Sequence, residues 1–185
     1  MAQLTSIMTL QLAEDFDRAF GRRAPGLMVR AETEADSGFL RDLFVRCSPL
    51  RERLAPEMLA MQWRFQDASH RDAHPLAMRR IALAEGMPVG RILVDWTLAD
   101  RSQGIDIAVD PEHRSRGAGL AMLRAWVDVA DAWERPCELT VLSANPARKI
   151  YERLGFRAEQ DLVDGTPLLV MIRPVRQRPS AAGIS

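Results

Sequence analysis

The stretch that decides the fold is Ile105-Asp-Ile-Ala-Val-Asp-Pro-Glu-His-Arg-Ser-Arg-Gly-Ala-Gly-Leu120. A strand is expected to run up to Val109, and Asp110-Pro111 should end it. A turn with two arginines and two glycines follows, and apolar residues at helical spacing begin at Gly119. Amides at the start of a helix have no intrahelical partners, and the helix dipole adds positive potential there. The stretch therefore predicts an anion site, and phosphate is the usual anion.

The residue types of this turn suit a phosphate. Gly117 and Gly119 let the backbone approach a ligand without a side-chain clash, and Arg114 and Arg116 add positive charge. The chain lacks the G-x-x-x-x-G-K-[ST] motif of P-loop proteins and the G-x-G-x-x-G motif of dinucleotide-binding folds. Taken alone, R-x-x-G-x-G is short, and a glycine-containing helix start with solvated arginines is the alternative interpretation.

A second motif is Asn145-Pro-Ala-Arg-Lys-Ile-Tyr-Glu-Arg-Leu-Gly-Phe156. It predicts a short helix with Asn145 as its N-cap, a proline in the first turn and Gly155 at its C-terminal end. Tyr151, the only tyrosine in the chain, lies on this helix. An ordinary tyrosine has a pKa of about 10 and is protonated at neutral pH, so it can donate a proton to a thiolate leaving group. Alone, a single helical tyrosine is more often a packing residue.

Hydrophobic spacing elsewhere predicts strands and helices that alternate along the chain. A mixed sheet with helices on both faces is the natural packing of such an order. The strands are expected at 27–31, 80–85, 89–96, 104–109, 139–142, 156–163 and 168–172, and the helices at about 33–48, from Pro56 onward, at 119–133 and at 145–155.

The helix within residues 1–25 and the helix that begins near Pro56 each carry an apolar stripe. A helix within residues 1–25 is marginal in length unless it docks on something, and Gly21–Gly26 should end it. Its stripe is Leu12, Phe16, Ala19 and Phe20. The helix that begins near Pro56 has a stripe of Leu54, Met58, Met61, Phe65 and Ala68, which we expect to face the core, with Trp63 beside it.

Composition narrows the class of protein. The 185 residues are 47% hydrophobic and 27% charged, which excludes a disordered chain and a disulfide miniprotein. The formal net charge of zero argues against nucleic acid or an anionic membrane as the main partner. With no transmembrane run and no secretory signal, we expect a cytoplasmic protein. Cys47 and Cys137 lack metal or redox spacing, and the three histidines lack zinc spacing.

The two motifs, in this order and separated by a long helix and a short strand, resemble those of the GNAT superfamily of acyl-CoA-dependent N-acetyltransferases. Residues 27–36 also resemble the opening strand and first helix turn of that family. The resemblance covers residues 26–173, which leaves 1–25 as an N-terminal extension and 174–185 as a flexible C-terminal tail. It implies an α/β (α+β) GNAT acyltransferase fold. That fold is a mixed, mostly antiparallel β-sheet, splayed into a V between the fourth and fifth strands, with helices on both faces.

The resemblance implies that acetyl-CoA binds in this V without a metal. Its pyrophosphate would lie on the amides of Arg116 to Leu120, and its pantetheine chain would run beside the fourth strand like an added strand. A backbone amide of that strand would polarise the thioester carbonyl. Tyr151 would act as the catalytic acid that protonates the departing sulfur of CoA. The implied cofactor-binding residues are Ile107, Ala108, Val109, Arg114, Ser115, Arg116, Gly117, Ala118, Gly119, Leu120 and Asn145.

The implied reaction is direct attack by a primary amine, of a small molecule or a protein, on the thioester. The amine must first lose a proton, because an ordinary amine is mostly protonated at pH 7. Some family members carry a glutamate on the fifth strand, where this chain has Leu139-Thr-Val-Leu142. Strand alternation would turn Asp106 away from the cleft. The candidate bases are Asp106, Glu85, Asp95, His70, His74 and an ordered water chain.

The acceptor should bind against residues 46–76, since the first two helices of the family cover the cleft. Arg51, Arg53 and Arg64 there could attract a carboxylate, although a solvated helix face is the alternative. The missing strand carboxylate leaves a non-catalytic acyl-CoA-binding module or a partner-dependent subunit as a second hypothesis. A toxin-type enzyme acting on aminoacyl-tRNA is a third hypothesis, which the zero net charge disfavours. Many members of the family form homodimers, but no residue pattern here specifies an interface.

Overall fold

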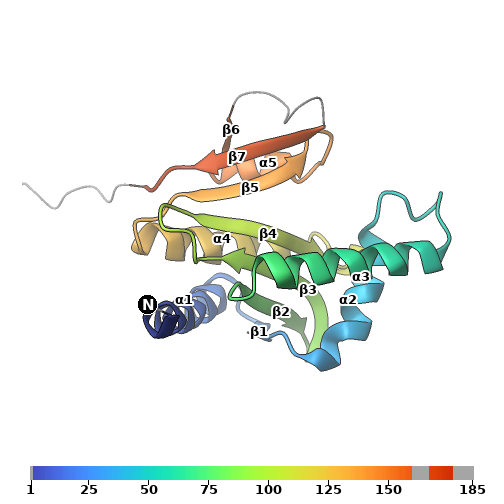
Figure 1. Ribbon diagram of the computed structural model, residues 1–185, viewed down its shortest axis with the longest axis horizontal. Coiled ribbons are helices and arrows are strands. Elements are labelled where there is room, and N and C mark those ends of the chain that lie inside the picture. Colours follow the sequence, from blue (N-terminus) through green and yellow to red (C-terminus); the bar gives the residue numbers. More distant parts are fainter. Residues whose placement is uncertain (1, 160–166, 177–185) are drawn as a thin grey trace, which may run out of the picture.

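Seven strands form one open sheet in the order β1-β2-β3-β4-β5-β7-β6 within residues 2–159 and 167–176, which the computed structural model describes (Figure 1). Neighbouring strands are antiparallel except β4 and β5, which are parallel and therefore need a long crossover connection. The strands are β1 (Leu27–Ala31), β2 (Met78–Ala84), β3 (Met87–Asp95), β4 (Ser102–Val109), β5 (Cys137–Leu142), β6 (Arg157–Ala158) and β7 (Leu168–Arg173).

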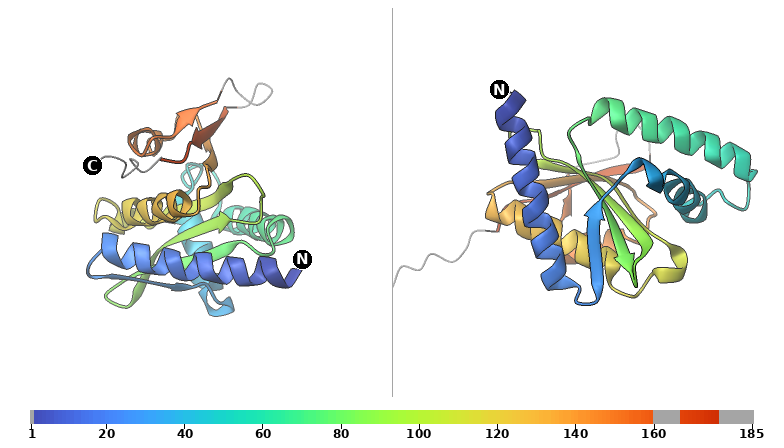
Figure 2. Two further views of the ribbon diagram at one scale, coloured as in Figure 1. Left: turned by 90° about the vertical axis from the view of Figure 1, so that its left-hand side faces the viewer. Right: turned by 90° about the horizontal axis from the view of Figure 1, so that it is seen from below.

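Helices cover both faces of this sheet, as Figure 2 shows. On one face, α1, α4 and α5 pack into a single large apolar core. On the other face, α2 and α3 pack around a small cluster of Leu40, Ile81 and Leu83. The helices are α1 (Ala2–Arg23), α2 (Ser37–Cys47), α3 (Pro56–Ala73), α4 (Ala118–Ala132) and α5 (Arg148–Arg153), with short 3-10 turns at Glu34–Asp36 and Pro111–His113. The predicted α/β architecture is confirmed.

Most predicted strands begin and end within one or two residues of the expected limits. The strand expected at 156–163 is β6 over Arg157 and Ala158, and residues 160–163 lie outside the described part of the chain. Residues 177–185 of the expected tail lie outside it as well. No helix in the described part is long and apolar enough to cross a membrane.

The N-terminal helix α1 is longer than its sequence alone would support. Its predicted stripe is buried, with Leu12, Phe16 and Phe20 each at 0% exposure, and it docks beside α4 in the large core. The guanidinium of Arg23 donates to both carboxylate oxygens of Asp128 on α4, at 2.8 and 2.9 Å. These contacts extend α1 through Arg23, so the break expected from Gly21 comes two residues later than predicted.

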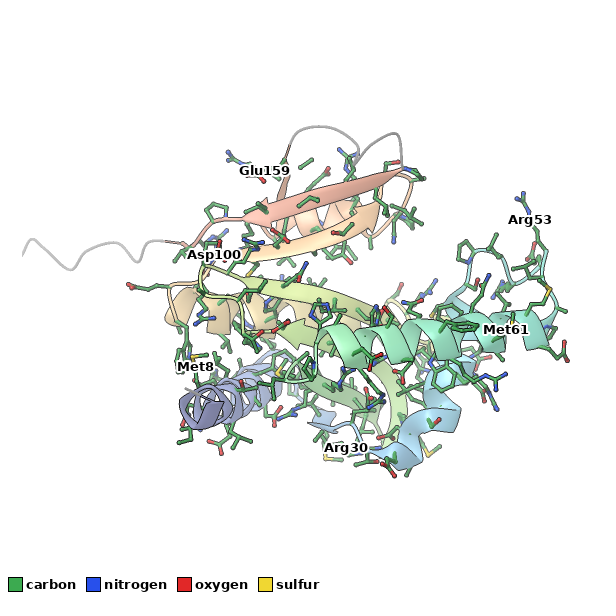
Figure 3. The ribbon with its side chains drawn as sticks, viewed as in Figure 1. Met8, Arg30, Arg53, Met61, Asp100 and Glu159 are labelled. Carbon is green, nitrogen blue, oxygen red and sulfur yellow. The ribbon has the colours of Figure 1, made fainter. Side chains whose placement is uncertain are left out.

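The predicted buried stripe of α3 is wrong. Met58, Met61 and Phe65 are 48%, 46% and 70% exposed, and Figure 3 labels Met61 on this helix. The face that α3 turns to the sheet carries Leu59 and Trp63 and then polar residues, because the sheet beneath its second half is charged. Buried charges need partners, so the polar side of the helix faces inward.

The sheet opens between β4 and β5. These strands pair only from Ser102 to Gly104, against Cys137 to Leu139 on β5. Beyond Gly104, β4 continues to Val109 and β5 to Leu142 without pairing to each other, and Figure 1 shows the two strands diverging. The V expected between the fourth and fifth strands is therefore present.

Trp126 of α4 holds the closed end of this V. A Cβ placed on Gly104 would lie 2.6 Å from the indole ring, so the strand accepts the ring only because position 104 has no side chain. The indole Nε1 donates to the hydroxyl of Ser102 at 3.0 Å. Both residues belong to the three-residue segment of β4 that pairs with β5, so one side chain fixes the vertex.

We predict that Phe16→Ala destabilises the protein by about 3–5 kcal/mol, because the ring is fully buried between α1 and the rest of the core. The matched control is Leu10→Ala on the same helix. Its side chain is 64% exposed, so the change should stay within about 0.5 kcal/mol. Urea denaturation followed by circular dichroism measures both values. Equal losses in the two variants would contradict the packing of α1 into the core.

Candidate active site

The turn between β4 and α4 has the geometry of an anion cradle. Gly117 has a φ of +93°, and no atom lies within 4 Å of a Cβ placed on it, so the backbone is open on that side. The first helical hydrogen bond across this turn runs from the amide of Ala121 to the carbonyl of Gly117, at 2.9 Å. Amides at the start of an α-helix have no carbonyl one turn back and are free for an anion.

The second glycine of the turn serves packing. A Cβ on Gly119 would come 3.2 Å from Cγ2 of Val109, at the end of β4. The absence of a side chain lets the first turn of α4 lie close against the strand. The turn therefore stays next to the open end of the V.

The C-terminal end of α2 clamps the start of the turn. Arg46 Nη2 lies 2.7 Å from a carboxylate oxygen of Asp110, whose other oxygen accepts a hydrogen bond from the amide of Glu112. Arg114 Nε donates to the carbonyl of Val109 at 3.2 Å, and its Nη2 lies 3.4 Å from Cys47 Sγ. The guanidinium of Arg114 is thus fixed at the base of the turn.

Ser115 and Arg116 of the turn are exposed, and His113 is half-buried. Ser115 has a φ of +61°, in the left-handed region that gives the turn its sharp bend. Arg116 and His113 line a cavity of about 190 Å³ against the turn between β2 and β3. Glu85, one of the candidate bases, lines this same cavity.

Tyr151 lies on α5, on the wall of the V formed by β5 and β7. Its ring is buried at 8% exposure and meets the Phe156 ring edge-on, with centroids 6.0 Å apart. Burial raises the pKa of its phenol, and the nearby negative charge of Asp106 on β4 raises that pKa further. The phenol is therefore protonated at neutral pH and available as a proton donor.

Asn145 plays a different structural part from the one expected. The helix α5 begins at Arg148 with Ala147 as its N-cap, so Asn145 is not the N-cap. Its side-chain oxygen accepts a hydrogen bond from the amide of Ala147 at 2.9 Å, which fixes a turn two residues before the helix. The correction follows from Pro146, which makes the chain turn once before the helical hydrogen bonds begin.

A β-bulge changes the direction of side chains along β4. Asp106 pairs with Leu93 on β3, but the next pair is Gly104 with Val94, so Ile105 is an extra residue. Gly104 faces Trp126 of α4, whereas Asp106 lies on the other face and reaches Arg91 Nη1 at 3.4 Å. Alternation is regular from Asp106 to Val109, and the extra residue Ile105 is what puts Gly104 on the α4 face as well. Ile107 and Val109 pack against the core on the α4 face.

The candidate bases are separated by the structure. His74 Nδ1 lies 2.7 Å from Asp95 Oδ2, and the other oxygen of Asp95 accepts hydrogen bonds from the amide and hydroxyl of Thr97. These two candidates therefore occupy each other. His70 is half-buried on the inner face of α3, within electrostatic range of Asp106. The charge of Asp106 raises the pKa of both His70 and Tyr151, so Asp106 is within electrostatic range of each.

Sequence reasoning missed a buried ionic layer beneath α3. Arg91 is 4% exposed, and its guanidinium lies 3.1 Å from Glu32, 3.4 Å from Asp67 and 3.4 Å from Asp106. Arg71 of α3 also contacts Glu32 at 3.0 Å and Asp67 at 2.8 Å. The available signal was an arginine in the middle of the apolar strand run 89–96, where a charge must find buried partners.

The arginines expected at the acceptor site favour the alternative interpretation, a solvated helix face. Arg51, Arg53 and Arg64 are exposed, as is Phe65, so this part of residues 46–76 is a solvated face. Trp63 lies inward beside the small cluster on the sheet. Among the described residues, no group of three or more histidine, cysteine, aspartate or glutamate side chains is arranged to hold a metal ion.

Comparison with known proteins finds a family match over the middle of the chain. Residues 79–158 match the family model described as an acetyltransferase (GNAT) domain. The L-amino acid N-acetyltransferase AaaT of Escherichia coli (strain K12) is 33% identical over 85 residues, which cover 43% of this chain and 52% of that protein. The match thus spans about half the length of this curated relative.

Solved structures share the fold. The PaiA N-acetyltransferase from Thermoplasma acidophilum, in complex with coenzyme A, has a TM-score of 0.63 at 17% identity, covering 80% of this chain and 98% of that one. The ribosomal-protein-S18-alanine N-acetyltransferase of Escherichia coli has a TM-score of 0.60 at 18% identity, covering 85% and 99%. These structures show the fold, and the family model shows that residues 79–158 resemble a GNAT acetyltransferase domain.

We predict that Tyr151 titrates above the ordinary tyrosine pKa of about 10 and that Asp106→Asn lowers its midpoint. Burial is the larger cause, so the midpoint in the variant should still exceed that of free tyrosine. Ultraviolet absorbance of the phenolate reports this residue alone, because the chain has one tyrosine. Asp100→Asn, at a side chain 71% exposed, is the control. An unchanged titration midpoint of Tyr151 in Asp106→Asn would show that the charge of Asp106 does not act on the phenol.

Proposed function

We propose that this protein transfers an acetyl group from acetyl-CoA to a primary amine of a small molecule or a protein. The observation that carries the proposal is the joint presence of an open V, a phosphate-type turn at its mouth and a buried, protonated tyrosine on its wall. The relatives support the reaction class, since one is an L-amino acid N-acetyltransferase and another is a ribosomal-protein-S18-alanine N-acetyltransferase.

The residues of the turn fit the pyrophosphate of acetyl-CoA. The open space at Gly117 admits a phosphate against the backbone, and the amides of Arg116 to Leu120 supply donors with Arg114 beside them. The edge of β4 beyond Gly104 is not paired to β5, so Ile107, Ala108 and Val109 suit an extended chain that pairs as an added strand. Ser115, Ala118 and Asn145 complete the proposed contact set.

The chain supplies two of the chemical roles directly. A backbone amide of β4 in the V would polarise the carbonyl that is attacked, as in an oxyanion hole. Tyr151 would give its proton to the departing sulfur, which its raised pKa permits because the phenol stays protonated at working pH. Direct attack by the amine needs no covalent intermediate on the protein.

The second hypothesis, a non-catalytic acyl-CoA-binding module or a partner-dependent subunit, rests on β5. The strand carries Thr140 where some family members carry a glutamate, and a threonine hydroxyl cannot act as a base. Steady release of CoA with any amine rejects this hypothesis. A cytoplasmic location remains part of the proposal, and the free thiols of Cys47 and Cys137 suit a reducing compartment.

We predict that acetyl-CoA binds the purified protein with micromolar affinity, about −8 kcal/mol, and that Gly117→Glu abolishes binding. Glutamate would fill the open side of the turn and repel the pyrophosphate. Gly86→Glu is the control, because Gly86 also has a positive φ and open space around it, on a different turn. Isothermal titration calorimetry measures acetyl-CoA binding to the wild-type protein and to both variants. Binding retained by Gly117→Glu would reject the proposed phosphate site.

We predict that Tyr151→Phe lowers kcat by about 10²-fold or more while acetyl-CoA affinity changes little, since only the proton donor is removed. The phenyl ring keeps the edge contact with Phe156 and therefore the packing. A thiol-detecting assay of CoA release across pH gives kcat, and calorimetry gives the affinity. Full kcat in the variant at every pH would eliminate the acid role of Tyr151.

A further inference from the structure

We infer that Arg46 on α2 is a positioning residue for the cofactor. Through its ion pair with Asp110, it holds the turn between β4 and α4 in the conformation that receives the pyrophosphate of acetyl-CoA. This inference rests on the proposed acetyl transfer. It adds to the proposed cofactor site a residue that lies on another helix and outside both sequence motifs.

The tip of this turn has no support of its own. Among the described residues, the amides of Ser115, Arg116 and Gly117 make no hydrogen bond to a backbone carbonyl or to a side chain. Ser115 and Gly117 both have a positive φ, of +61° and +93°, so the chain bends sharply here. Free amides suit an anion only while the turn stays in place, so its position depends on what holds its base.

The base of the turn is held by the last turn of α2. Arg46 Nη2 lies 2.7 Å from Oδ2 of Asp110, and the other oxygen of that carboxylate accepts a hydrogen bond from the amide of Glu112 at 3.1 Å. Asp110 is buried, and among the described residues no other cationic side chain pairs with it. Because an unpaired buried charge is costly, this carboxylate ties the turn to Arg46.

The next residue of α2 makes a second contact with the same base. Cys47 Sγ donates to the carbonyl of Val109 at 3.4 Å, and Nε of Arg114 donates to that carbonyl at 3.2 Å. Nη2 of Arg114 also lies 3.4 Å from Cys47 Sγ. A thiol is a weak donor, whereas a hydrogen bond between two charged groups is strong, so the ion pair of Arg46 is the main link.

Arg46 also determines the charge at the base of the turn. It lies in the last turn of α2, where the helix dipole favours a cation, and it neutralises Asp110. Without Arg46, the turn would lose its link to α2, and the unpaired carboxylate would repel a pyrophosphate on the neighbouring amides. Both effects weaken the binding of the same part of acetyl-CoA.

The alternative is an ion pair that only stabilises the fold. A stabilising role alone predicts that the variant unfolds more easily, while the folded protein binds every ligand as before. A general distortion of the site predicts weaker binding of every ligand. Positioning of the turn predicts a loss confined to ligands that carry the pyrophosphate, since the pantetheine chain is proposed to lie along β4 instead.

The test compares acetyl-CoA with acetyl-pantetheine, which has the same thioester and no pyrophosphate. We expect Arg46→Met to weaken acetyl-CoA binding about 10-fold by isothermal titration calorimetry. Binding of acetyl-pantetheine, followed by ligand-observed NMR, should stay as in the wild type. Arg46→Lys keeps the charge and should recover most of the affinity. Arg41→Met is the matched control, because Arg41 lies on the same helix and pairs with Asp42 instead.

A double-mutant cycle tests the route through Asp110. Asp110→Asn keeps an oxygen for the amide of Glu112 and removes the charge that pairs with Arg46. In this background, Arg46→Met should weaken acetyl-CoA binding by no more than about 2-fold, because the pair is already lost. Losses that simply add would show that Arg46 acts by another route and would overturn the inference. Circular dichroism confirms that each variant is folded.

The outcomes distinguish this inference from the proposed function. A folded Arg46→Met protein that binds acetyl-CoA as tightly as the wild type, or that loses affinity equally for acetyl-CoA and acetyl-pantetheine, would overturn the positioning role and leave acetyl transfer intact. A wild-type protein that does not bind acetyl-CoA would overturn the proposed function and the role of Arg46 together.

Discussion

The packing of Trp126 against Gly104 and Ser102 is the constraint on which the rest of the site depends. It joins β4 and β5 at one end only, where three residue pairs link the strands. Beyond that point the two facing strand edges separate, and unpaired backbone groups inside a protein need partners. We propose that an extended ligand pairs with the strand edge and satisfies these groups. The tryptophan thus determines where the sheet stops being continuous and where the site begins.

The charged layer beneath α3 is held together by ion pairs, whereas the core around α1 and α4 is apolar. Arg91, Glu32 and Asp67 are almost fully enclosed, and each is kept by an opposite charge within 3.4 Å. Such a layer gains little stability over apolar packing, but it fixes geometry, because removing one partner leaves a buried charge. It sets the rotation of α3 and turns Met58, Met61 and Phe65 outward.

Tyr151 and His70 respond to burial in opposite ways. Tyr151 lies on α5, beside β5 and β7, and we propose it as the proton donor. Burial acts in opposite directions on an acid and on a cationic base. It raises the pKa of the Tyr151 phenol and lowers that of the His70 imidazole, while the charge of Asp106 raises the pKa of both groups.

The order of strands and helices and the glycine-containing turn between β4 and α4 could be predicted from the sequence, because periodicity and turn residues act over short distances along the chain. Trp126 and Tyr151 could be assigned to helices in the same way. Which side of α3 is buried could not be predicted, since it depends on Arg91 in a strand elsewhere in the sequence. The extra residue Ile105, which puts Gly104 and Asp106 on opposite faces of β4, was likewise visible only in the fold. A bulge and a buried ion pair are set by contacts between distant segments, and local patterns carry no record of them.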